Sequence, residues 1–203
     1  MTENISRSIV TRLPEAEVDP IFVDRWSRRA LADRPLSPQQ VASLFEAARW
    51  APSASNLQPW LFVYASQPED LGRVRVLLKD ANQRWATRAP LLVFVFARKI
   101  NPETGAPIRT AAFDTGAAWQ SIALQAHKLG LSARAMGGIH LDQTYDLLGV
   151  PRDEFDAIIG IAIGHPGERE ELPADLHERE QPNARKSTRE FAFEGRYAAP
   201  ITR

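Results

Sequence analysis

The chain has 203 residues, and its 25 basic and 25 acidic side chains give a formal net charge of zero. It contains no cysteine, which excludes a disulfide framework, a thiolate metal site and a catalytic thiol. Balanced charge argues against a dedicated nucleic-acid-binding protein, and an apolar content of 44% excludes a disordered chain. Any redox chemistry would therefore depend on a bound cofactor.

The length suits a single domain, which we place over residues 1–203 with an N-terminal extension (1–19) and a loop region (165–184). The apolar run 89–97 is too short for a membrane helix, and the N-terminus lacks an apolar signal core. We therefore expect a soluble, cytoplasmic protein.

The first strong element is a helix that begins after Ser37. Ser37 can cap it, Pro38 suits its first position, and Gln40 completes a capping box. Apolar residues then recur at helical spacing on one face, at Val41, Leu44, Phe45 and Ala48. Pro52 ends the helix.

Strands and helices alternate along the rest of the chain. Strands are predicted at 61–65, 91–97, 131–136 and 157–163, with a terminal strand at Glu190–Phe193. Helices are predicted at 68–79, 110–129 and 142–148, with Gly130 as a C-terminal cap. This order favours one sheet covered by helices but does not fix the order of its strands.

Two basic segments could bind an anion. Arg25 and Arg29 would share one face if a helix continued through them, and with Ser27 they would suit a phosphate. The alternative is a solvated basic turn that pairs with neighbouring carboxylates. The segment 183–188 is a second basic and polar cluster, which either closes over a phosphate or forms a solvated tail.

Two loops could contact a flat ligand. The segment 51–60 holds serines, Asn56 and Gln58 between two tryptophans, and is either a binding loop or an ordinary turn. Gly137 and Gly138 follow a predicted strand, where their backbone would allow close approach of a ligand. The alternative for this glycine pair is a tight turn.

Several other types of site lack support in the sequence. The four histidines have no metal-ligand spacing, and no nucleophile elbow, dinucleotide-binding or P-loop motif occurs. Asp114 lies in an alanine-rich helix, so we expect a hydrogen-bonded structural residue rather than a general base.

Taken in order, these segments resemble the FMN-dependent nitroreductase family over about residues 20–196. The resemblance is carried by Arg25-x-Ser27-x-Arg29, by Glu46–Trp60, by Asn82–Trp85 with Ala89-Pro90, by Asp114–Gly130, by Ala135–Gly138, and by Arg185-Lys186 with Glu190-Phe191. It implies an α+β fold of three layers, with a mixed, mainly antiparallel sheet flanked by helices. It also implies an intertwined homodimer with FMN at the subunit interface.

The same resemblance implies roles for particular residues. Those expected at the FMN phosphate and nearby ring edge are Arg25, Trp26, Ser27 and Arg29, with Arg185 or Lys186 as a second phosphate contact. Those expected at the isoalloxazine are Asn82 and the backbone N–H groups of Gly137 and Gly138. Those expected from the other subunit are Pro52, Ser53, Ala54 and Asn56.

The implied reaction is a ping-pong exchange, in which NADH or NADPH reduces FMN and a nitroaromatic or quinone-like acceptor reoxidises it. It requires no metal and no side chain acting as acid or base. Three departures from the family pattern are Leu31 in place of an aromatic residue, Gly137 in place of a side chain, and a short connection from Ala97 to Thr110. The alternatives are another flavin reaction (dehalogenation, azoline oxidation or flavin fragmentation) and a non-catalytic flavin-binding protein.

Overall fold

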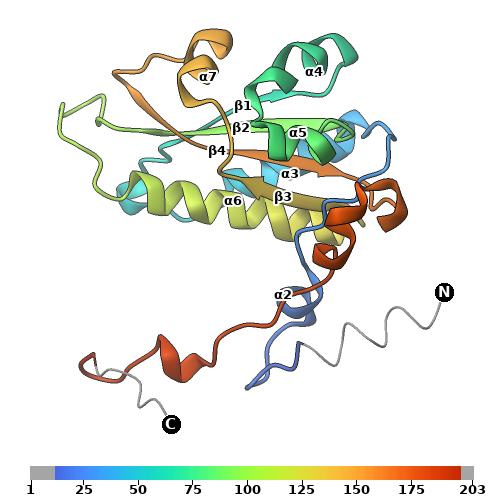
Figure 1. The fold of residues 1–203 in the computed structure, drawn as a ribbon. Coiled ribbons are helices and arrows are strands. Elements are labelled where there is room, and N and C mark those ends of the chain that lie inside the picture. The colour runs from blue at the N-terminus through green and yellow to red at the C-terminus, as the bar shows by residue number, and fades with distance from the viewer. Residues whose placement is uncertain (1–11, 198–203) are drawn as a thin grey trace.

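The computed structural model describes residues 12–197 and shows one sheet with helices on both faces (Figure 1). The strands are β1 (Trp60–Ala65), β2 (Leu91–Arg98), β3 (Ser132–Met136) and β4 (Phe155–Gly164). The α-helices are α2 (Pro20–Asp24), α3 (Pro38–Arg49), α4 (Pro68–Val74), α5 (Asp80–Ala86), α6 (Ala111–Lys128) and α7 (Leu141–Leu148). Short 3₁₀ turns are η1 (Ala54–Asn56), η2 (Arg75–Leu77), η3 (Arg169–Glu171), η4 (Ala174–Arg179) and η5 (Thr188–Glu190).

The four strands run in the order β1-β2-β4-β3, and each neighbouring pair is antiparallel. Strand β2 is central and buried on both faces, as its continuous apolar sequence predicts. Its alternate residues enter two separate cores. Leu92, Phe94 and Phe96 pack in the core that includes residues of α4 and α5, whereas Leu91, Val93 and Val95 pack in the core with α3 and α6.

Helix α3 begins as its sequence predicts. The Ser37 hydroxyl accepts a hydrogen bond from Gln40 N (3.1 Å), and the Gln40 side chain accepts one from Ser37 N (2.9 Å), which completes the capping box. Val41, Leu44 and Ala48 are buried. At the end of α6, Gly130 takes a left-handed conformation (φ +69°), which confirms the predicted cap.

Tertiary contacts end the predicted 68–79 helix early. The chain leaves α4 through η2 and becomes extended at Leu78 (φ −81°, ψ 135°), which forms a β-bridge with Ile139. Lys79 N donates to Gly138 O (3.0 Å), and the separate helix α5 begins one residue later. Pairing with the segment after β3 therefore overrides the helical pattern, and the sequence missed α5.

One other local prediction was wrong, and the helix considered for the first basic segment does not form. The expected strand at Glu190–Phe193 is η5 followed by a turn, because Ser187 and Glu190 form a capping box that reverses the chain. Helix α2 ends at Asp24, and Arg25 is extended (φ −65°, ψ 126°), so no helix continues through the first basic segment. The loop region 165–184 is largely irregular but contains η3 and η4.

The two ends of the described chain leave the body of the protein on the same side (Figure 1). Glu15 near one end is hydrogen-bonded to Thr188 near the other. Both segments expose large apolar side chains, namely Leu13, Phe22, Phe191 and Tyr197. Within residues 12–197, no helix combines the length and apolar character needed to cross a membrane.

Candidate functional site

The first basic segment, α6, β3 and the segment after η4 enclose a cavity of about 610 Å³, here called the arginine pocket. Trp26 and Ser27 line it together with six arginines, Arg12, Arg25, Arg29, Arg134, Arg179 and Arg185. The structure thus brings Arg185 beside the first basic segment, although about 160 residues separate them in the sequence. The predicted convergence of the two basic segments is present in this cavity.

The arginine pocket carries more positive than negative charge. Among the described residues, the one ion pair made by these six arginines joins Arg29 to Glu180, at 4.0 Å. Burial lowers the pKa of Arg25, and burial together with the nearby Arg29 and Arg179 lowers the pKa of Arg134 to about 10. Both effects disfavour the cationic form, so a bound anion would offset the cost of holding these positive charges together.

Buried hydrogen bonds shape the first basic segment. The Glu180 carboxylate accepts hydrogen bonds from Arg29 N (2.9 and 3.0 Å) and from Ala30 N (3.0 Å), and its side chain is 2% exposed. The Arg134 guanidinium donates to Ser27 O. The guanidinium of Arg28 lies over the Trp26 ring instead, 4.6 Å from its centroid.

The first basic segment lines the pocket without helical structure. Arg25, Trp26, Ser27 and Arg29 all line the pocket, and Arg28 does not. The sequence predicted that these residues converge, and the structure places them in one cavity without a helix. Leu31, which stands where the family has an aromatic residue, is 2% exposed and lies outside the pocket.

The predicted glycine turn lies just beyond the pocket. Ala135 lines the pocket, and Gly137 follows it after about 7 Å of strand. Asn82 Nδ2 donates to Gly138 O (2.9 Å), so the structure brings these two predicted residues together. A Cβ at Gly138 would lie 2.6 Å from Asn82 Nδ2, whereas one at Gly137 would meet nothing within 4 Å. The close contact with Asn82 therefore favours glycine at 138, whereas the space at 137 would admit a side chain.

The predicted loop 52–56 is strained and does not line the arginine pocket. Ser55, Asn56 and Gln58 all have positive φ (51°, 56° and 46°), a conformation that L-residues adopt rarely. The Asp114 carboxylate accepts from Ala54 N (3.2 Å) and from the Thr110 hydroxyl (3.0 Å), which confirms it as a hydrogen-bonded residue.

One chain does not bring this loop to the arginine pocket. The loop is tied to α6 at Asp114, while the arginine pocket borders α6 at Trp119, Gln120 and Ala123. Between five and nine residues of helix separate Asp114 from these positions, about 8 to 14 Å along the axis. Lys186 also lies outside the arginine pocket, in an apolar hollow between the two terminal segments.

Three arginines of the pocket were not expected from the sequence, Arg12, Arg134 and Arg179. The sequence could have indicated Arg134, because it is the one charged residue in the otherwise apolar or small β3 sequence. Arg12 lies in an irregular segment and Arg179 at the end of η4, where an arginine is ordinarily solvated.

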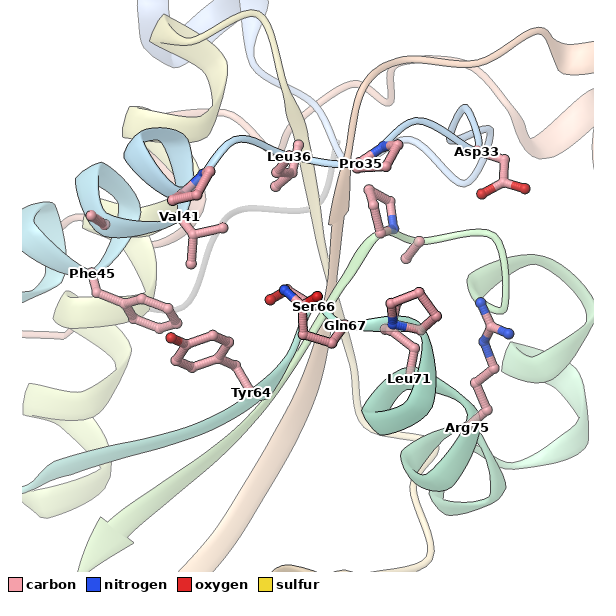
Figure 2. A pocket seen from close by; sticks show the side chains of 15 residues that line it. Asp33, Pro35, Leu36, Val41, Phe45, Tyr64, Ser66, Gln67, Leu71 and Arg75 are labelled. Atoms are coloured by element: carbon pink, nitrogen blue, oxygen red, sulfur yellow. The ribbon is translucent and has the colours of Figure 1, made fainter.

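A second cavity of about 530 Å³ lies between α3, the end of β1 and α4 (Figure 2). Figure 2 shows Phe45 and Tyr64 facing each other at one end, with ring centroids 4.8 Å apart, and Asp33 and Arg75 at the other. Most of its lining is apolar, and none of the predicted site residues contributes to it. The arginine pocket is therefore the candidate site.

Two further expectations concern metal binding and the short connection from Ala97 to Thr110. In the part of the chain that the structure describes, no group of three His, Asp or Glu side chains could hold a metal ion. The connection before α6 is a compact loop closed by a bridge between Ile100 and Pro107. Asn101 N donates to Ala106 O (2.8 Å), and Ile108 N donates to Lys99 O (2.7 Å).

The sequence and fold match known proteins. The model of the Nitroreductase family matches residues 23–80 and 72–165, so the chain belongs to this family. A crystal structure described as an oxidoreductase containing FMN is 45% identical, with a TM-score of 0.89 over 93% of this chain and 97% of that one. A nitroreductase structure with FMN from Exiguobacterium sibiricum has a TM-score of 0.73 at 19% identity, over 89% of this chain and 99% of that one.

A protein of Streptomyces coelicolor, assigned as an NADH dehydrogenase/NAD(P)H nitroreductase, is 25% identical over 181 residues, which span 76% of this chain and 86% of that one. These matches confirm the family, the α+β fold and the oxidoreductase class that the sequence indicated.

Proposed function

We propose that this chain binds FMN in the arginine pocket and acts as an NAD(P)H-dependent flavin oxidoreductase. The observation that carries the proposal is the charge of the pocket, where six arginines face one another beside the glycine turn in a nitroreductase fold. The FMN described in similar structures is consistent with it.

The residues present fit a flavin mononucleotide. A phosphate monoester carries close to two negative charges at neutral pH, and guanidinium groups bind it through paired N–H donors. We assign the phosphate to Arg25, Ser27 and Arg185, and the ring to Trp26, Arg29, Asn82, Gly137 and Gly138. When bound, FMN supplies the chemistry of accepting a hydride and passing electrons on.

The contribution of the chain is positional and electrostatic. The arginines form a fixed positive environment that favours any negative charge developing in the pocket. Glu180 and Arg134 hold the backbone of the first basic segment, so that this charge is already in place before a ligand binds. We assign no side chain as acid or base.

We further propose that the functional unit is a homodimer. The strained loop holds Pro52, Ser53, Ala54 and Asn56, and none of them lines the arginine pocket of its own chain. Its anchor Asp114 lies at least five residues along α6 from the pocket lining, about 8 Å or more. Trp50 just before the loop is 73% exposed, and Phe113 beside the loop's anchor Asp114 is 80% exposed. Such residues are typical of an interface, so a second copy would supply this loop to the site.

For the electron acceptor we propose a flat, electron-poor molecule of the nitroaromatic or quinone class. The loop between β2 and α6 is short and contains no helix. The choice between NADH and NADPH is left to experiment.

An anaerobic absorbance spectrum of the FMN-loaded protein tests the proposal. We expect the oxidised flavin band to be lost on addition of NADH or NADPH, and to return when a quinone or nitroaromatic compound is added. A protein that fails to bind FMN contradicts the proposal. A yellow protein that neither nicotinamide reduces would instead be a flavin-binding protein without this activity, and reduction without reoxidation by either acceptor would indicate another flavin reaction.

A further inference from the structure

The N-terminal extension contributes an arginine to the arginine pocket. Arg12 lies eleven residues before the region that the family model matches, which begins at residue 23. Its Nη1 donates to Val23 O (2.6 Å) and to Arg25 O (2.9 Å), and its Nε donates to Asn183 O (3.1 Å). One guanidinium therefore joins the segment that carries Arg25 to the segment that carries Arg185.

A second contact ties the extension to the C-terminal segment. The Glu15 carboxylate accepts hydrogen bonds from Thr188 N (2.9 Å) and from the Thr188 hydroxyl (2.7 Å). These hydrogen bonds lower the pKa of Glu15. The extension thus crosses between the two basic segments and is fixed to both.

The arrangement brings like charges together. Burial and the positive charges of Arg185 and Arg25 lower the pKa of Arg12, and Arg185 also acts on Arg25. Within residues 12–197, none of these three arginines forms an ion pair with a carboxylate. Arg12 and Arg25 are partly buried and Arg185 is exposed, and three cations that repel one another are stabilised when an anion lies between them.

We propose that Arg12 is a positioning residue for the cofactor phosphate, and that the N-terminal extension completes the phosphate site by holding Arg25 and Arg185 together. The inference rests on the proposed binding of FMN. It gives the extension a role that its sequence alone did not reveal. Arg12 acts through the backbone carbonyls that it holds and through its charge, so its loss disturbs phosphate binding and leaves the ring site intact.

The test compares two flavins that differ by the phosphate. Dissociation constants of FMN and riboflavin are measured by fluorescence titration of the full-length flavin-free protein and its variants. We expect Arg12→Ala to weaken FMN by about tenfold or more and riboflavin by less than twofold. Glu15→Gln should weaken FMN less, in the same direction.

Two further variants separate charge and folding from positioning. Arg12→Lys keeps the charge but loses the planar fork that reaches three carbonyls, so it should restore only part of the FMN affinity. Arg73→Ala removes an exposed arginine that pairs with Asp70 outside the pocket, and should change neither affinity.

The outcomes distinguish this inference from the function on which it rests. Unchanged FMN affinity in Arg12→Ala, equal weakening of both flavins, or full affinity in Arg12→Lys would each overturn the role of Arg12. A wild-type protein that binds FMN no more tightly than riboflavin would refute the proposed phosphate site itself.

Discussion

Two cavities of this protein, the arginine pocket and the pocket of Figure 2, are similar in size and opposite in character. The arginine pocket encloses about 610 Å³ and the pocket of Figure 2 about 530 Å³, yet six arginines line the first and mostly apolar side chains line the second. Volume alone therefore does not identify the cofactor site. The chemistry of the lining does, because binding pockets select ligands through a few placed polar groups.

The two cavities also differ in how the chain builds them. Segments close in sequence form most of the second pocket, from α3 to α4. The arginine pocket joins segments more than 150 residues apart, and Glu180 is the buried group that links the last of them to Arg29. Substitutions that break long-range contacts should therefore disrupt the arginine pocket more than the pocket of Figure 2.

The largest expected effect is the loss of phosphate binding. Replacing both Arg25 and Arg185 by alanine should weaken FMN by about 100-fold or more, because each charge-assisted pair contributes roughly 1.5–3 kcal/mol. Tyr64→Phe in the other pocket is the matched control and should leave FMN affinity unchanged. Equal FMN affinities of the double variant and the control would remove the distinction between the pockets.

Removal of the buried carboxylate should have the next largest effect. Glu180→Ala leaves the N–H groups of Arg29 and Ala30 without their acceptor, and we expect a loss of about 3 kcal/mol in the free energy of unfolding. Urea titration measures it. Glu178→Ala removes an exposed carboxylate from the rim of the same pocket and should cost less than about 0.5 kcal/mol. A similar small loss of unfolding free energy in both variants would contradict the role of Glu180 in holding the first basic segment.

The paired glycines give a matched test of close packing. Gly138→Ala forces a Cβ to within 2.6 Å of Asn82 Nδ2 and should destabilise the protein by about 1–3 kcal/mol. Gly137→Ala meets open space and should be nearly neutral. Thermal unfolding of the two variants decides the point, and the reverse order would show that the turn is arranged differently.

The smallest expected effect concerns the strained loop. Asp114→Asn weakens the acceptor of the Ala54 N–H and Thr110 hydroxyl hydrogen bonds, and should cost about 1 kcal/mol in unfolding free energy. The exposed Asp142→Asn loses one surface ion pair with Arg152 and should cost less. Equal losses in a urea titration would show that Asp114 does not support the loop.

Local signals in the sequence predicted much of the fold. The capping box of Ser37 and Gln40 and the continuous apolar run of β2 act over a few residues, so they can be read directly. The break after Leu77 could not, because it depends on the bridge between Leu78 and Ile139. The strand predicted at Glu190–Phe193 failed for a local reason, the capping hydrogen bonds of Ser187 and Glu190, which the apolar pattern concealed.

The residues of the candidate site show the same difference between local signals and long-range contacts. Arg25, Ser27, Arg29 and Arg185 belong to recognisable motifs, and the structure places them in one cavity. Arg12 could not be assigned from sequence, because its role depends on carbonyl groups 11 and 171 residues away. Basic residues in irregular segments acquire a function only through such distant contacts.

The central claim is that the arginine pocket recognises the phosphate of the flavin, and one titration of the wild-type protein tests it directly. The dissociation constants of FMN and riboflavin are measured at low and at high salt. We predict that FMN binds about 100-fold more tightly than riboflavin at low salt and that salt reduces this difference, since the added contacts are ionic. Equal affinities for the two flavins at low salt would contradict the account.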